Sequence, residues 1–132
     1  MNKQPVFAGS FYPEKPEELT NLLNSYMSDQ KVEYKSKAII VPHAGVYYSG
    51  YAAMAAFERL ELNENIFIIA PSHQESFNNI ALPKYTYFDT PLGSLEVNNR
   101  LIKDIADKFP CIISNDILNS VLIDPNLVLK VI

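Results

Sequence analysis

An α/β domain, with a mostly parallel sheet flanked by helices, is the fold class that the sequence predicts. Two compact apolar runs, Lys37–Val41 and Asn65–Ala70, are each rich in isoleucine and closed by a proline, which is typical of buried strands. The segment between them, Ser49–Leu60, is rich in alanine, contains Tyr51 and Met54, and has the length of a helix. The order of strand, loop, helix and strand indicates a parallel βαβ unit.

The remaining elements follow from local patterns. A helix over Pro16–Ser28 is predicted because a proline suits the first helical turn, where its missing N–H costs nothing. Glu17 and Glu18 complement the positive end of that helix, and leucines follow at helical spacing. Further along the chain we predict short strands within Phe77–Thr90, a turn at Pro91–Ser94, an amphipathic helix over Asn98–Lys108 and a short strand over Cys111–Ser114.

Composition excludes several classes of protein. The chain has 132 residues, of which 48% are apolar, and this is the size of one domain with a real core. A formal net charge of -4 and the lack of any basic stripe argue against nucleic-acid and anionic-membrane partners. A single cysteine, with no apolar signal segment near Met1, indicates a cytoplasmic protein.

Both histidines of the chain follow a predicted strand directly. His43 lies in Val41-Pro42-His43-Ala44-Gly45, and His73 lies in Ala70-Pro71-Ser72-His73. Ligands of parallel α/β sheets bind beyond the carboxyl ends of the strands, so neighbouring strands would bring both imidazoles into one crevice. Two converging imidazoles suit Zn, Cu, Fe or Ni. The alternative is that each histidine is a hydrogen-bonded loop residue.

A metal site of this kind usually has a third protein ligand. Asp89, Asp116 and Cys111 are candidates by their chemistry. Asp89 precedes Thr90-Pro91 and has the alternative role of a turn cap, whereas Cys111 begins a predicted strand and suits the core. Of the three, Asp116 is the best placed to be the third ligand, because it follows the short predicted strand over Cys111–Ser114. The alternative is that Asp116 is a solvated carboxylate in a loop. Ser72 beside His73 is not expected to form a nucleophile–base pair, because adjacent side chains on an extended chain point apart.

Four short motifs, taken together, resemble those of a known family. They are Ala8–Pro13, Val41–Gly45 with Tyr48–Gly50, Pro71–His73 and Thr90–Gly93. In order and spacing they are similar to the motifs of the Memo family, whose prokaryotic members are named AmmeMemoRadiSam system protein B. The resemblance runs from about Val6 to Asp116.

This resemblance implies a fold similar to the catalytic subunit of class III extradiol dioxygenases. It implies that His43 and His73 match two metal ligands of the family, with iron or copper as the metal. Phe11, Tyr48 and Ser72 would line the same cleft. Two functions stay open: a metal-dependent, dioxygenase-like oxidoreductase, and a non-catalytic module that binds a small molecule or peptide in the cleft.

The chain also departs from the family pattern. Gln74 stands where many relatives have a second histidine after the position of His73. A Glu-His-Ser-type motif is expected after Asp116, yet the chain continues to an apolar tail, Leu127–Ile132. We therefore expect a single, truncated or frame-shifted domain over residues 1–132, with weak metal binding. A third hypothesis is a fragment with no competent site that self-associates through a bare strand edge and this tail.

Overall fold

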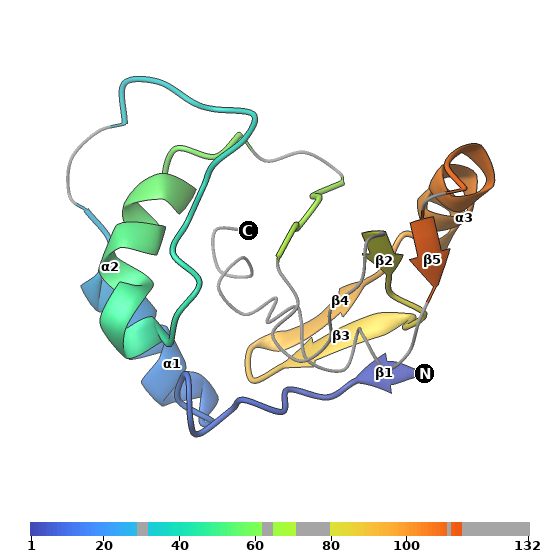
Figure 1. Cartoon of the computed structure of the whole chain (residues 1–132). Coiled ribbons are helices and arrows are strands. Elements are labelled where there is room, and N and C mark those ends of the chain that lie inside the picture. Colours follow the sequence, from blue (N-terminus) through green and yellow to red (C-terminus); the bar gives the residue numbers. More distant parts are fainter. Residues whose placement is uncertain (29–31, 62–64, 71–79, 111, 115–132) are drawn as a thin grey trace.

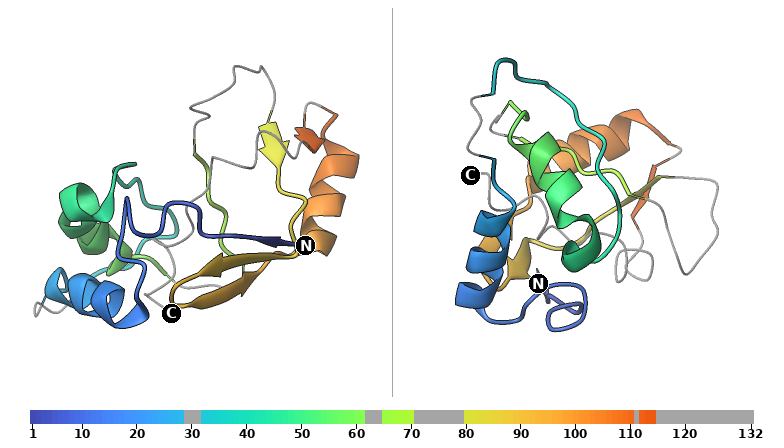
Figure 2. Two further views of the ribbon diagram at one scale, coloured as in Figure 1. Left: turned by 90° about the horizontal axis from the view of Figure 1, so that it is seen from below. Right: turned by 90° about the vertical axis from the view of Figure 1, so that its left-hand side faces the viewer.

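The computed structural model describes residues 1–28, 32–61, 65–70, 80–110 and 112–114 (Figure 1). Its elements, in chain order, are β1 (Asn2–Lys3), α1 (Pro16–Ser25), α2 (Val46–Phe57), β2 (Ile80–Leu82), β3 (Tyr87–Thr90), β4 (Gly93–Glu96), α3 (Asn99–Lys108) and β5 (Ile112–Ser114). Helices α1 and α2 lie together at one end, and α3 lies beside β5 at the other (Figures 1 and 2). The α/β class is confirmed.

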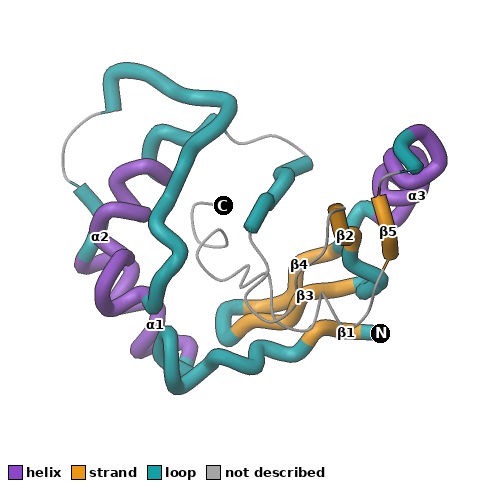
Figure 3. The backbone as a smooth tube through the Cα atoms, viewed as in Figure 1, coloured by secondary structure: helices purple, strands orange, loops and turns teal. Residues whose placement is uncertain are grey.

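The sheet is mixed, so the prediction of a mostly parallel sheet is not exact. Strand β3 lies between β1, which pairs with it in parallel, and β4, which pairs with it antiparallel. The β3–β4 hairpin arises because the Pro91-Leu92 turn reverses the chain within two residues, whereas a parallel connection needs a dozen or more. Strands β2 and β5 form a separate parallel pair, with Ile80 opposite Ile112 (Figure 3).

Two predicted strands, Lys37–Val41 and Asn65–Ala70, are not strands in the structure. Neither range belongs to a ladder within the part of the chain that the structure describes. One isolated parallel bridge precedes the first range, where the Ser36 N–H donates to the Arg59 carbonyl at 2.7 Å and the Glu61 N–H donates to Ser36 at 2.8 Å. The expected βαβ unit is therefore wrong for the described residues, because a strand needs a backbone partner in addition to an apolar run.

The three predicted helices are confirmed, with shifted ends. Helix α1 begins at Pro16 as predicted and ends at Ser25 rather than Ser28. Helix α2 begins three residues earlier than predicted, at Val46, directly after Gly45. Helix α3 has a side-chain cap: the Asn98 carboxamide oxygen accepts the Leu101 N–H at 3.0 Å.

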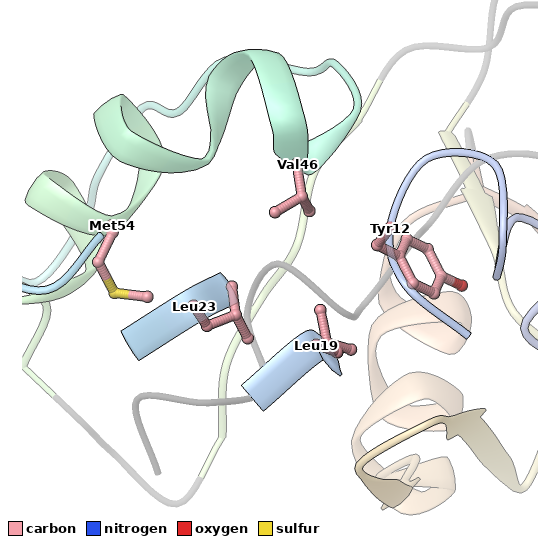
Figure 4. Packing of buried hydrophobic residues seen from close by; sticks show 5 residues of the cluster. All are labelled: Tyr12, Leu19, Leu23, Val46 and Met54. Atoms are coloured by element: carbon pink, nitrogen blue, oxygen red, sulfur yellow. The ribbon is translucent and has the colours of Figure 1, made fainter. Parts of the chain in front are cut away.

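The main core joins α1 to α2. Its buried side chains are Tyr12, Leu19, Leu23, Val46 and Met54 (Figure 4). Leu92, from the turn between β3 and β4, packs against the same cluster and so ties the sheet to the helices. A second cluster consists of Ala53, Phe57 and Leu60, with Ile39 and Val41 packed against it.

Among the described residues, no helix has both the length and the apolar character needed to cross a bilayer.

Candidate functional site

The loop that carries His43 is held between two motifs that lie far apart in the sequence. The Val46 N–H, at the start of α2, donates to the Phe11 carbonyl at 2.8 Å. Gly45 lies so close to Phe11 that a methyl group on it would come within 3.3 Å of both the Phe11 ring and its carbonyl oxygen. The segment around Phe11 therefore clamps the loop two residues after His43, and the small size of Gly45 permits this approach.

Ser49 fixes the other side of this loop. Its side chain is buried, and its hydroxyl donates to the Ala44 carbonyl at 3.0 Å and lies 3.3 Å from the Gly45 carbonyl. The Tyr48 and Ser49 N–H groups also donate to the Gly45 carbonyl, at 2.9 and 3.1 Å. These bonds give the two residues after His43 a defined conformation, while His43 itself is exposed.

The described members of the predicted cleft lining reach the surface. Tyr48 is 92% exposed, and Phe11 is 49% exposed. The Phe11 ring packs against Phe7, with ring centroids 4.9 Å apart. The structure therefore brings Phe11 to the His43 loop and places Tyr48 in the first turn of the helix that follows. Ser72 and His73, and the candidate ligands Asp116 and Cys111, lie outside the described residues.

Asp89, the described candidate for a third ligand, is already engaged elsewhere. Its carboxylate accepts hydrogen bonds from Ser94 Oγ at 2.6 Å, from Gln4 Nε2 at 2.8 Å and from Asn2 Nδ2 at 3.1 Å. These bonds connect β1, and the residue after it, to the β3–β4 hairpin. Bonds from Ser94 and Asn2 hold the pKa of the Asp89 carboxyl below its ordinary value. Asp89 is thus a structural carboxylate that fixes strand register.

An Asp89→Asn variant is expected to be less stable than the wild type at pH 7, with a flatter pH dependence. The folded-state pKa of Asp89 lies below its unfolded value of about 4. The contribution of the Asp89 carboxylate to the free energy of unfolding is therefore fully present above that unfolded value. It is lost as the pH falls through the folded-state pKa. Urea unfolding midpoints measured between pH 7 and about pH 3 test this, with Glu33→Gln as an exposed control. A pH profile of Asp89→Asn that matches the wild type would contradict this role.

Within the described ranges, no group of three His, Cys, Asp or Glu side chains is arranged to hold a metal ion. Of the two histidines that are predicted to bind the metal, His43 lies within these ranges and His73 does not. Gly45 and Ser49, which position the loop, are not among the site residues that the sequence predicts. Their signal was present, since both lie in the motif around His43, but the contact with Phe11 depends on the fold.

Comparisons with known proteins agree with the family that the four motifs indicate. The model of the family described as "Memo-like protein" matches residues 3–121. A MEMO1 family protein of Aquifex aeolicus is 35% identical over 109 residues, which cover 82% of this chain and 40% of the relative. MEMO1 family proteins of Thermoplasma acidophilum and Saccharomyces cerevisiae are 36% and 35% identical, over 76% of this chain in each case and over 39% and 32% of the relatives. The chain thus spans less than half the length of these relatives, and it belongs to the Memo-like family.

Proposed function

We propose that His43 and His73 hold a transition-metal ion, iron or copper, in a cleft that serves a dioxygenase-like oxidoreductase reaction. The observation that carries this proposal is the clamped loop at His43. The His43 imidazole is exposed, and contacts with Phe11 and Ser49 fix the two residues that follow it, Ala44 and Gly45. A ligand presented from a constrained loop loses little freedom when it binds, which favours coordination.

The donor chemistry fits iron or copper at His43, because a neutral imidazole is a ligand that both metals accept. The metal, when bound, supplies a Lewis acid and a redox centre to the reaction. The protein's own part is to hold the loop that carries the imidazole, through hydrogen bonds to the Ala44 and Gly45 carbonyls, and to line the cleft with Phe11 and Tyr48. Asp89 takes no part, since its oxygens serve the sheet.

The chain is expected to bind Fe(II) and Cu(II) weakly, with dissociation constants well above the nanomolar range. Two neutral imidazoles bring no negative charge to offset that of a divalent ion. His43→Ala and His73→Ala should each weaken metal binding by more than about tenfold. Removal of a residue that only supports a ligand typically costs at least that much, and removal of the ligand itself should cost more. Calorimetric titration, under anaerobic conditions for Fe(II), measures both effects.

The matched control is Asp89→Asn, which removes the charge of the described carboxylate candidate and is expected to leave the metal affinity unchanged. Nanomolar binding that survives His43→Ala would contradict the proposal, and so would a wild-type chain that binds neither ion. Circular dichroism of each variant separates loss of a ligand from loss of the fold.

A second candidate function is a non-catalytic module that binds a small molecule or peptide. The exposed ring of Tyr48, with the half-exposed ring of Phe11, favours it, because exposed aromatic side chains are common in recognition surfaces. Phe11, Tyr48 and Ser72 would line this surface. A chain that is purified without metal, and that takes up none in the titration, supports this function over the first.

A further inference from the structure

Ser49 is a buried polar side chain in the first turn of α2, and its hydroxyl reaches beyond the helix. The residue is 6% exposed and lies between Val46 and Ala53 on the buried face. A serine hydroxyl within a helix ordinarily donates to the carbonyl of the fourth residue before it, and the Gly45 carbonyl lies at that position, 3.3 Å away. The shorter bond, at 3.0 Å, goes to the Ala44 carbonyl, five residues back and outside the helix. Helix geometry alone therefore does not account for the shorter contact.

Gly45 has the greatest backbone freedom of any residue type, and two hydrogen bonds restrain it. Its backbone, with φ -55° and ψ 143°, is extended and open to any residue, so its conformation does not require glycine. The close approach of Phe11, which would lie 3.3 Å from an added methyl group, requires it instead. Ser49 holds the Ala44 carbonyl before Gly45. Phe11 holds the Val46 N–H after it. Gly45 is thus restrained from both sides.

We propose that Ser49 is a positioning residue of the metal site, which holds the His43 loop in its metal-bound conformation before the ion arrives. This inference rests on the proposed function, because it assigns a role toward the ion that His43 would bind. The hydroxyl acts through the carbonyl of Ala44, the residue next to His43. Freedom that is already removed in the metal-free chain is not lost again on binding, so the restraint raises the metal affinity.

The test measures the affinity of the full chain for Cu(II) by calorimetric titration. Ser49→Ala removes the hydroxyl and should bind Cu(II) about fivefold more weakly than the wild type, the effect of one hydrogen bond of ordinary net strength. Ser49→Thr keeps a hydroxyl at the same position and should restore most of the affinity. His43→Ala removes the ligand itself and should lose more affinity than Ser49→Ala.

The matched control is Ser25→Ala on α1. The exposed Ser25 hydroxyl also donates to a carbonyl of its own helix, that of Leu22 at 2.6 Å. Ser25→Ala should therefore leave the Cu(II) affinity unchanged. Urea unfolding of every variant shows whether a change in affinity follows from a change in global stability.

Hydrogen exchange in the metal-free chain gives a second readout, which does not depend on any ion. The Val46 and Tyr48 amides donate to the Phe11 and Gly45 carbonyls and so report on the restrained loop. Both amides should exchange faster in Ser49→Ala, by about the same factor as the loss of affinity, through local opening of the loop. Amides in α1 should keep their wild-type rates.

The outcomes separate this role from the metal function itself. If the wild type binds Cu(II) and His43→Ala does not, an affinity of Ser49→Ala within about twofold of the wild type overturns the positioning role and leaves the proposed function standing. A folded Ser49→Thr chain that binds as weakly as Ser49→Ala also overturns it, because the hydroxyl would then not be the cause. A wild-type chain that binds no ion overturns the proposed function, and the role of Ser49 toward the ion is then wrong as well.

Discussion

A Leu19→Ala variant unfolds with a free energy about 2–5 kcal/mol lower than that of the wild type, the usual cost of truncating a fully buried leucine. Leu19 is 0% exposed and belongs to the cluster that contains Tyr12, Leu23 and Val46. The loss combines the removed apolar contacts with the cavity that remains where α1 meets α2. Urea denaturation followed by circular dichroism measures it.

The control lies on the same helix. Leu22 is half-buried and packs at the edge of the same cluster, so Leu22→Ala should cost less than Leu19→Ala. Equal losses at the two positions would contradict the packing of α1. The effect also reaches the candidate site, because Val46 belongs to this cluster and its N–H holds the Phe11 carbonyl beside the His43 loop.

A Gly50→Ala variant is expected to lose stability, although alanine is the better helix former. An added methyl group at Gly50 would lie 2.5 Å from Tyr26 Cε2 and 2.9 Å from Tyr26 Cδ2. Such overpacking typically lowers the free energy of unfolding by about 1–3 kcal/mol. The higher helix propensity of alanine raises it by about 1 kcal/mol. A net loss of about 1 kcal/mol follows, and thermal or urea unfolding measures it.

The Tyr26→Ala background tests the cause of that loss. Without the Tyr26 ring, the methyl group keeps only its tight contact with Val46 Cγ1, at 3.0 Å. Gly50→Ala should then cost less by about 1 kcal/mol, a coupling typical of residues in contact. If the effects of the two substitutions on stability are additive, contact with the Tyr26 ring is not the cause of the destabilisation by Gly50→Ala.

Local patterns predicted the helices well, because the signals that start and stop a helix lie within the helix itself. Pro16 marks the first turn of α1, and the spacing of its leucines is that of its buried face. The turn between β3 and β4 was also predictable, since Pro91–Gly93 carries the residues that such turns prefer. Errors of a few residues at the ends of α1 and α2 reflect caps that depend on neighbouring segments.

Strands were predicted less well, because a ladder joins residues that are distant in the sequence. The apolar runs at 37–41 and 65–70 have the composition of buried strands, but composition does not supply a partner. Conversely, β1 contains only Asn2 and Lys3, and no sequence pattern predicts it as a strand. It nevertheless pairs with β3, and Asp89 on β3 accepts hydrogen bonds from Asn2 and Gln4.

The sequence by itself determined the α/β class, the three helices and the Memo-like family, because periodicity, turn residues and ordered motifs are properties of the chain alone. Only the tertiary structure decided that Phe11 and Ser49 hold the loop behind His43, and that the Asp89 carboxylate serves the sheet. It also decided which face of segment 37–42 lies on α2 and which lies bare at Ile40. Each of these depends on contacts between residues that the fold brings together, and no local pattern specifies such contacts.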